Sequence, residues 1–339
     1  MKVFRFVLLL LLFVLVLQPV FGRQIIIKIG SPTPANTIWG KALNDLAEEW
    51  YRISGGEVVL KLYHGTAGTE DDMIGKMKFG SLQGVVLTSW GLNHIAPDSL
   101  VVSMPLLIRN DEEFFYALKK VDPLLKSKII PPERGDRHGG FNVLAWTLAG
   151  WMKFFAKKPV SEPEDLKKLK LATSASDPNM YRAWVDLGYN VEPVTSDALA
   201  AKLSSGAIEA VYFIPLATIL FFQQVPYMTD MKIAPVLGGI VLAENAWSKI
   251  PDKYKPQFQE SIDRMVEDLN RSTAKLEADK IAEMESLGLK PVSVPPASQE
   301  KWINAFKNAT QMIMGKSFSQ EIYDTLNNVL EEYRKTHGK

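Results

Sequence analysis

The feature that most constrains the fold is an uninterrupted helical pattern near the end of the chain, over residues 252–286. Pro256, close to its start, is the one residue there that interrupts helix-forming sequence, and apolar residues return at roughly helical spacing from Phe258 to Met284. At a rise of 1.5 Å per residue, about 30 residues make a helix about 45 Å long. A helix of that length does not fit inside one small lobe, so the sequence predicts two lobes with this helix lying across both.

A second stretch, residues 165–215, indicates what the lobes are made of. Three short strand patterns alternate there with two helical patterns, each of which ends at a glycine. The strands are predicted at residues 170–173, 190–193 and 210–214. Strands and helices that alternate over so few residues form parallel β-α-β units, and ligands gather at the carboxyl ends of such strands. The predicted fold class is therefore α/β, with the ligand site at these strand ends.

Strand and helix patterns in the rest of the chain complete the two predicted lobes. Further strands are predicted at residues 24–30, 58–63, 85–89, 141–146, 152–157, 231–236 and 240–244. The strands on either side of Ala149-Gly150 are predicted to form a crossover ribbon between the lobes, and Gly238-Gly239 is predicted to be a turn rather than an anion-binding site. The predicted division is residues 23–145 with about 216–250 in lobe 1, residues 146–215 with about 287–339 in lobe 2, and 252–286 as the spanning helix. Two amphipathic helices, 299–314 and 319–335, close the chain.

The first 22 residues are predicted to be a signal peptide rather than part of the fold. Lys2 and Arg5 precede an unbroken apolar run at residues 6–17, and small residues suited to cleavage follow at 19–22. The run is short for a membrane span, although an uncleaved anchor is the alternative. The chain has no cysteine, which excludes disulfides and a lipid anchor on an N-terminal cysteine. We therefore expect an exported, soluble protein, located in the periplasm.

Several functional classes are not indicated by the sequence. There is no basic block and no interleaved run of aromatic and basic residues, so nucleic acid is not an expected partner. The four histidines lack the spacing of metal ligands, and the chain carries no nucleophile elbow, zinc motif, phosphate loop or dinucleotide fingerprint. We therefore predict no enzyme activity, no cofactor and no metal.

Several segments, taken in order, resemble one known family, the substrate-binding proteins of TRAP (tripartite ATP-independent periplasmic) transporters, typified by binders of C4-dicarboxylates. The segments are SGGEVVLKLY at 54–63, GSLQGVVLTS at 80–89, MPLLI at 104–108, EPEDLK at 162–167, SGAIEA at 205–210 and WSKIP at 247–251. The resemblance covers residues 24–290. It implies a periplasmic-binding-protein-like fold, with two α/β lobes around a central cleft and a long helix spanning both. It also implies a ligand that is handed to a membrane permease driven by an ion gradient.

The chain departs from the family at the residue that usually binds a ligand carboxylate. The family has an arginine there, in a segment like L-K-[small apolar]-R just after P-E-D-L-K, and this chain has Ala172. Alanine cannot replace the planar, two-pronged contact of a guanidinium with a carboxylate. A polar residue that the family often has before the proline of the third strand is likewise Ile214 here. The resemblance therefore implies the fold of the family without its carboxylate clamp.

Other candidate ligand contacts are mostly aromatic. The residues at positions where the resemblance places the cleft are Trp39, Trp90, Trp146, Trp151, Tyr212 and Phe213. A pocket lined by aromatic side chains suits an apolar or amphipathic ligand, although for any single tryptophan a place in the ordinary core is the alternative. Ser89 and Thr173, at strand ends, are candidate hydrogen-bonding groups. Glu70 is a further candidate, and its alternative is a carboxylate that interacts with the dipole of its own helix.

We therefore expect the solute-binding component of a TRAP-type transporter, which captures a hydrophobic or amphipathic ligand and delivers it to the permease. Two alternatives remain open. The first is a periplasmic carrier or scaffold that acts through a partner, because a subgroup of the family associates with periplasmic tetratricopeptide-repeat proteins. The second is a binder of a small organic acid, in which Lys170 or Arg182 takes the part of the missing arginine.

Overall fold

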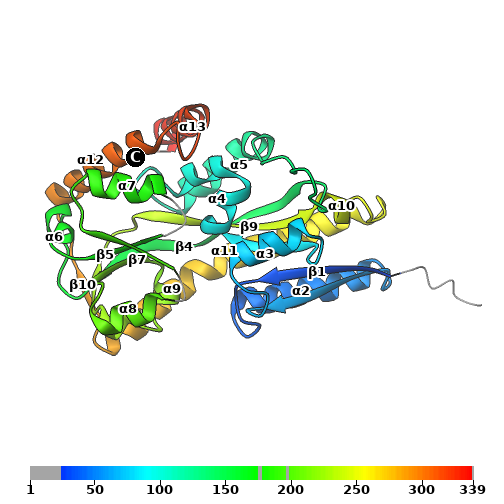
Figure 1. Cartoon of the computed structure of the whole chain (residues 1–339), viewed down its shortest axis with the longest axis horizontal. Coiled ribbons are helices and arrows are strands. Elements are labelled where there is room, and N and C mark those ends of the chain that lie inside the picture. Colours follow the sequence, from blue (N-terminus) through cyan, green and yellow to red (C-terminus); the bar gives the residue numbers. More distant parts are fainter. Residues whose placement is uncertain (1–23, 175–177, 196–197, 338–339) are drawn as a thin grey trace, which may run out of the picture.

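The structure, a computed structural model, describes residues 24–174, 178–195 and 198–337. In this part of the chain ten strands form one mixed sheet. Figure 1 shows helices flanking the sheet. The strand order is β2-β1-β3-β9-β4-β7-β5-β6, with β8 beside β4 and β10 beside β8. The predicted signal peptide, residues 1–22, lies outside the described residues. No helix among the described residues combines the length and the apolar character that crossing a membrane requires.

The sheet has a first and a second part, which share β4. The first part holds β1 (Ile25–Ser31), β2 (Val58–His64), β3 (Gly84–Thr88) and β9 (Ala234–Ala243). The second holds β5 (Leu171–Ser174), β6 (Val191–Val194), β7 (Ala210–Phe213), β8 (Tyr227–Thr229) and β10 (Lys290–Val292). Strands β5, β6 and β7 run parallel to one another, which confirms the predicted β-α-β units and the α/β fold class.

Fourteen helical segments connect and flank these strands in the described residues. Those around the first part are α2 (Ile38–Ile53), α3 (Glu70–Lys78), α4 (Ser89–Ile95), η1 (Pro97–Ser103), α5 (Asp111–Ser127) and α10 (Glu244–Trp247). Those around the second part are α6 (Pro163–Lys167), α7 (Pro178–Asp186), α8 (Leu199–Ser205), α9 (Pro215–Thr218), η2 (Phe222–Gln224) and α12 (Pro296–Ile313). The remaining two are α11 (Lys255–Ser286) and α13 (Gln320–His337). The side chains of Thr69 and Asp72 form a capping box at the start of α3.

Strand β4 (Phe141–Ala156) joins the two parts of the sheet. The prediction of a ribbon of two separate strands is wrong here, because the chain forms one continuous strand. Residues 141–152 pair with β9, and residues 153–156 pair with β7. The chain passes Ala149 and Gly150 by a register shift, or β-bulge, rather than by a turn, so pairing with β9 continues on both sides. Gly150 has φ = 142°, a conformation that glycine adopts readily and other residues rarely do.

Strand β9 is also continuous, which corrects the predicted turn at Gly238-Gly239. Both glycines pair with β3 on one side and β4 on the other. A Cβ atom added at Gly239 would lie 2.9 Å from Leu92 Cδ2, too close for an ordinary contact. Glycine here leaves room for Leu92 of α4 against the sheet, and it does not mark a change of chain direction.

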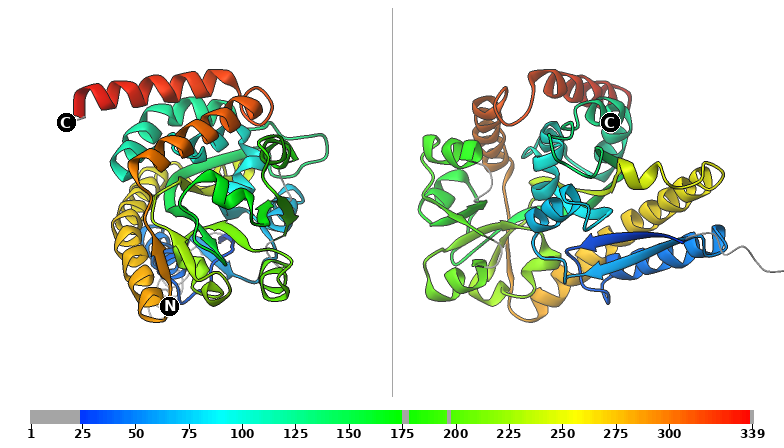
Figure 2. Two further views of the ribbon diagram at one scale, coloured as in Figure 1. Left: turned by 90° about the vertical axis from the view of Figure 1, so that its left-hand side faces the viewer. Right: turned by 45° about the vertical axis from the view of Figure 1, so that its right-hand side comes forward.

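Helix α11 is the long helix that the sequence predicted. Its 32 residues extend about 48 Å at 1.5 Å per residue. It packs against α2 and β4, and further along against α9, so it lies across both parts of the sheet. The left-hand view of Figure 2 shows it running along one side of the molecule.

Polar side chains of α11 bind the main chain of β4 where the strand is irregular. Gln259 Nε2 donates to the carbonyl oxygen of Leu144, the residue at the first register shift (3.1 Å). At the second shift, Asn270 Oδ1 accepts from the Leu148 amide (3.2 Å) and Glu277 Oε2 accepts from the Trp151 amide (3.3 Å). A bulge leaves buried main-chain groups without partners in the ladder, and such groups are costly unless they are hydrogen-bonded. Helix α11 therefore supplies partners to both bulges.

The predicted lobe boundaries stay a prediction, and several elements, among them β8 and α13, have contacts that differ from that division. Strand β8, assigned to lobe 1, pairs with β4 and β10 in the second part of the sheet. Helix α13, assigned to lobe 2, packs on α5 and η1 beside the first part. There Arg334 donates to both carboxylate oxygens of Glu113 (2.8 and 2.7 Å), a bidentate pair that holds the pKa of this buried carboxyl below its ordinary value.

Substituting Gly150→Ala is expected to destabilise the protein by about 1–3 kcal/mol, because alanine is strained at φ = 142° although its Cβ would have room there. Gly75→Ala is the matched control, since Gly75 lies inside α3 with open space around it and alanine favours a helix by up to about 1 kcal/mol. Urea unfolding followed by tryptophan fluorescence measures both. Equal stability of the two variants would show that the bulge does not depend on this glycine.

Candidate functional site

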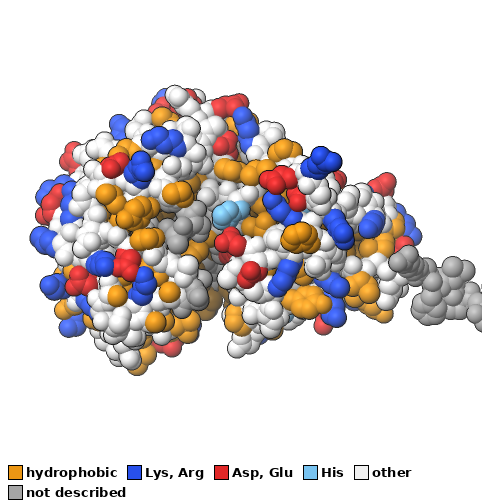
Figure 3. Space-filling model, viewed as in Figure 1, with side chains coloured by type: hydrophobic (Ala, Val, Ile, Leu, Met, Phe, Trp, Pro, Cys, Tyr) orange, Lys and Arg blue, Asp and Glu red, His pale blue; other side chains and the backbone are white. Residues whose placement is uncertain are grey.

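A pocket enclosing about 1110 Å³, part of it open to solvent, lies between the two parts of the sheet. On one side it is bounded by α4, η1 and the start of β9, and on the other by β5, β7, α7 and the start of α8. In Figure 3 a recess separates the two halves of the molecule on the face shown, and hydrophobic side chains gather beside it. The ends of β5 and β7 open into this pocket, which is where the β-α-β pattern places a ligand.

The lining is apolar and aromatic, with a few uncharged polar groups. Its aromatic and thioether side chains are Trp90, Trp184, Tyr212, Phe213, Met104, Met152 and Met180. Its polar side chains are Ser89, Asn93, Ser103, Thr173, Thr195 and Tyr212. No lysine, arginine, histidine, aspartate or glutamate lines the pocket among the residues that the structure describes. Methionine is flexible and polarizable, so this wall can adapt to an irregular apolar shape.

The structure brings six of the eleven sequence-predicted site residues together in this pocket. They are Ser89, Trp90, Ala172, Thr173, Tyr212 and Phe213. The Tyr212 hydroxyl is buried without a hydrogen-bond partner in the described residues, and burial raises its pKa well above the ordinary range. Contact of these residues with a ligand stays a prediction. Met104, Met152 and Trp184 were missed, because in the sequence they look like ordinary core residues of an apolar segment or a helix.

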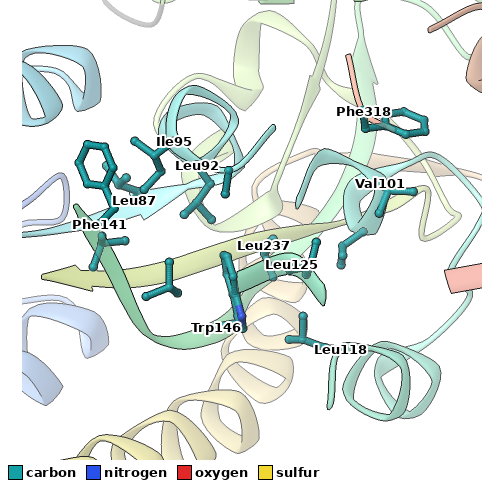
Figure 4. Close-up of a cluster of buried hydrophobic side chains, with 14 of the residues drawn as sticks. Leu87, Leu92, Ile95, Val101, Leu118, Leu125, Phe141, Trp146, Leu237 and Phe318 are labelled. Carbon is teal, nitrogen blue, oxygen red and sulfur yellow. The ribbon is translucent and has the colours of Figure 1, made fainter. Parts of the chain in front are cut away.

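The other predicted residues lie outside the lining. Trp39 packs on the core formed by α2, β1, β2 and α11. Trp146 is buried in the core shown in Figure 4, where its Nε1 donates to Asp122 Oδ1 (2.6 Å). Trp151 and Ile214 lie at the bulge of β4, beside Gly150. Each of these three tryptophans packs in or against the hydrophobic core, and a place in the ordinary core was the alternative that the sequence left open.

Glu70 does not line the pocket, but it holds in place α4, a helix that does. Its Oε1 accepts from the Thr88 hydroxyl (2.8 Å), and its Oε2 accepts from the amides of Thr88 (3.0 Å) and Gly91 (2.8 Å). These amides belong to the N-cap and first turn of α4, which have no partner within the helix. Burial raises the pKa of Glu70, and these hydrogen bonds oppose that effect. Glu70 therefore fixes α4, which carries Trp90 and Asn93 into the pocket.

Neither cation proposed as a substitute for the missing arginine reaches the pocket. Lys170 forms an ion pair with Glu192 on β6, and Lys202 of α8 pairs with the same carboxylate. These two lysines lower the pKa of Glu192 to about 2. Arg182 is exposed on α7 and does not line the pocket. Neither Lys170 nor Arg182 therefore provides a cation to the pocket.

A buried charged group lies at the bulge of β4, next to the pocket. Burial raises the pKa of Glu277 to about 6, although the Trp151 amide, Lys153 and Lys232 favour its charged form. Lys232 Nζ and Trp151 Nε1 both donate to Asp111 Oδ1, each at 2.7 Å. The arrangement links the first residue of α5, the bulge of β4 and the middle of α11. It is a structural contact between the two parts of the sheet.

The described residues contain no group of three or more histidine, aspartate or glutamate side chains placed to hold a metal ion. The one histidine that is fully buried, His138, accepts from the Gly140 amide through Nδ1 (2.8 Å) and contacts Asp136 through Nε2 (3.1 Å). These contacts order the loop before β4. They account for this side chain without a ligand.

Comparison with known proteins assigns the chain to a family. The profile of the DctP family, described as "Bacterial extracellular solute-binding protein, family 7", matches residues 29–317. A "Solute-binding protein" of Verminephrobacter eiseniae is 23% identical over 190 residues, which is 56% of this chain and 55% of that relative, so the match spans about half of its length. The 2,3-diketo-L-gulonate-binding periplasmic protein YiaO of Escherichia coli is 26% identical over 255 residues, 74% of this chain and 73% of that one.

Solved structures show the same fold. A TRAP periplasmic solute-binding protein of Xanthobacter autotrophicus with bound β-D-galacturonate matches with a TM-score of 0.77 at 17% identity, over 90% of this chain and 99% of that one. One from Sulfurospirillum deleyianum with bound succinate matches with a TM-score of 0.76 at 18% identity, over 90% and 98%. At such identities the likeness establishes the fold, in agreement with the two-lobed α/β prediction.

Substituting Glu70→Ala is expected to cost about 2–4 kcal/mol of stability, because it leaves the Thr88 and Gly91 amides without their acceptor. The control is Asp71→Ala in the same turn, an exposed residue whose contact is a surface pair with His94, for which a change within about 0.5 kcal/mol is expected. Urea unfolding compares the two. If Glu70→Ala is as stable as Asp71→Ala, the carboxylate does not fix α4.

Glu277 is expected to make the protein less stable as the pH rises. Because its pKa is raised from 4.5 to about 6 in the folded state, the native protein binds the proton more tightly than the unfolded chain does. Between pH 4.5 and 6 the wild type should therefore lose about 2 kcal/mol of stability relative to Glu277→Gln, and the difference should stay constant above pH 6. Glu285→Gln, exposed on the same helix, is the control and should follow the wild type. Parallel curves for wild type and Glu277→Gln would contradict the raised pKa.

Proposed function

Because this chain belongs to the DctP family of bacterial extracellular solute-binding proteins, the solute-binding proteins of TRAP transporters, we propose that it captures a hydrophobic or amphipathic small molecule and delivers it to a TRAP-type membrane permease. The family is a solute-binding component of transport rather than an enzyme family. The single observation that carries the proposal is the uncharged, aromatic and methionine-rich lining of the pocket at the ends of β5 and β7. The predicted signal peptide supports delivery of the protein to the periplasm.

The choice of an apolar ligand rests on the cost of burying a charge. A carboxylate that leaves water for this pocket would need a cation or several donors in return, since an unpaired buried charge costs several kcal/mol or shifts its pKa until it is neutral. Ala172 stands where the family has its arginine, and Lys170 is paired with Glu192. An apolar ligand instead gains about 25 cal/mol for each Å² of apolar surface removed from water.

Small organic acids are the competing ligand class. Related structures contain succinate or galacturonate, and YiaO is described as a binder of 2,3-diketo-L-gulonate. Such a ligand would require a cation from a residue other than Lys170, and none lines the pocket in the described part of the chain. A carrier or scaffold that works through a periplasmic tetratricopeptide-repeat protein is the second candidate. Pull-down with the intact periplasmic protein would distinguish it, since a carrier of that kind would retain the repeat protein without the permease.

Native mass spectrometry of protein purified under mild conditions should show a bound apolar or amphipathic compound, and succinate should neither displace it nor raise the melting temperature. Ala172→Arg should reverse this profile, because a guanidinium at the end of β5 adds a carboxylate partner and fills apolar space. Ala282→Arg, exposed on α11, is the control and should behave like the wild type. Tight binding of succinate by the wild type, with no affinity for apolar compounds, would overturn the proposed function.

A further inference from the structure

If the chain binds an amphipathic ligand as proposed above, the polar end of that ligand needs partners in the pocket wall. Most polar side chains there are already engaged or out of reach. Ser89 Oγ is bonded to Ser103 Oγ (2.9 Å) and to both the amide and the carbonyl oxygen of Leu237 (3.0 and 3.2 Å). The Tyr212 hydroxyl is buried and is not exposed to solvent. These groups shape the pocket but do not offer a ligand a free donor and acceptor.

Asn93 is the polar residue of the lining that remains available on the α4 side. It lines the pocket and is half-buried, and its carboxamide has no hydrogen-bond partner among the described residues. It lies one turn after Trp90 on α4, the helix that Glu70 fixes through Gly91 and Thr88. A side chain on a fixed element can select a ligand more strictly than one on a mobile loop.

The chemistry of Asn93 defines the head group that it would bind. A carboxamide has two N–H donors and one carbonyl acceptor and carries no charge. The hydroxyls of Thr173 and Thr195, on the opposite wall, are also uncharged and have no hydrogen-bond partner within the described segments. Donors of this kind can satisfy a neutral carbonyl or amide, whereas an ionised carboxylate would lose its water without gaining a counter-charge.

We propose, building on the function above, that Asn93 is the specificity-determining residue of this pocket and that the ligand is an uncharged amphipathic molecule. Its head group offers both an acceptor and a donor, as a primary carboxamide does, and exchanges a pair of hydrogen bonds with the Asn93 side chain. Its apolar body lies against the methionines and aromatic rings of the opposite wall, among them Met152, Trp184 and Phe213.

Three probes with the same eight-carbon chain test the head group: octanamide, 1-octanol and octanoate at pH 8, where the acid is ionised. Binding to the full-length mature protein is followed by the fluorescence of the pocket tryptophans and by calorimetry. The wild type should bind octanamide about tenfold more tightly than octanoate. Asn93→Leu, similar in shape and apolar, should weaken octanamide about fivefold or more, to the level of 1-octanol, while 1-octanol changes less than about twofold.

Asn93→Ala repeats the measurement if the leucine variant does not fold, and Asn308→Leu, the same change at an exposed position of α12, should leave all three affinities unchanged. If octanoate binds the wild type as well as octanamide does, or if both Asn93 variants keep the preference for octanamide, the head-group assignment is wrong although the apolar site stands. If none of the three probes binds and succinate does, the proposed function fails and the head-group assignment fails with it.

Discussion

The two parts of this molecule depend on a single irregular strand and on the helix that supplies its missing hydrogen bonds. Strand β4 pairs with β9 in the first part of the sheet and with β7 in the second, and it passes between them through a bulge at Ala149 and Gly150. Asn270 and Glu277, two turns apart on α11, accept the main-chain amides on either side of that bulge. This joint between the two parts of the sheet consists of the bulge of β4 and the side chains of α11 that bind it. The side chains accept hydrogen bonds from buried amides that the sheet itself leaves unpaired.

The pocket takes its shape from this joint. Its two walls belong to different parts of the sheet, so any change in the angle between them changes the pocket. On the first wall, Glu70 fixes α4 by accepting from amides in the first helical turn, and it thereby sets the positions of Trp90 and Asn93. Glu70, which the sequence offers as a candidate ligand contact, therefore does not line the pocket but holds the helix that does. Only uncharged side chains line the pocket, within the part of the chain that the structure describes.

The chain shares its fold with relatives that are less than a third identical, and the resemblance to the family implies a departure at Ala172, where an arginine is expected. A fold of this type tolerates such divergence because it depends on the pattern of apolar residues and on a few backbone positions, whereas ligand choice depends on single side chains at strand ends. Ala172 and Lys170 illustrate this: the strand is retained, the arginine is absent, and the neighbouring lysine pairs with Glu192. The same scaffold therefore presents an apolar pocket.

The sequence alone determined the α/β class, the long spanning helix and the parallel β-α-β units, because periodicity is a local property. It could not determine that residues 141–156 form one strand, since a glycine with positive φ inside a bulge and a glycine in a turn look alike. Nor could the sequence distinguish tryptophans that line the pocket from tryptophans of the core: Trp90 lines the pocket, whereas Trp146 is buried in the hydrophobic core. Nothing in the sequence marks Asn93 as a pocket residue, because its place in the lining and its lack of a hydrogen-bond partner among the described residues arise only in three dimensions. Contacts between residues distant in sequence are decided by packing, and only the tertiary structure specifies them.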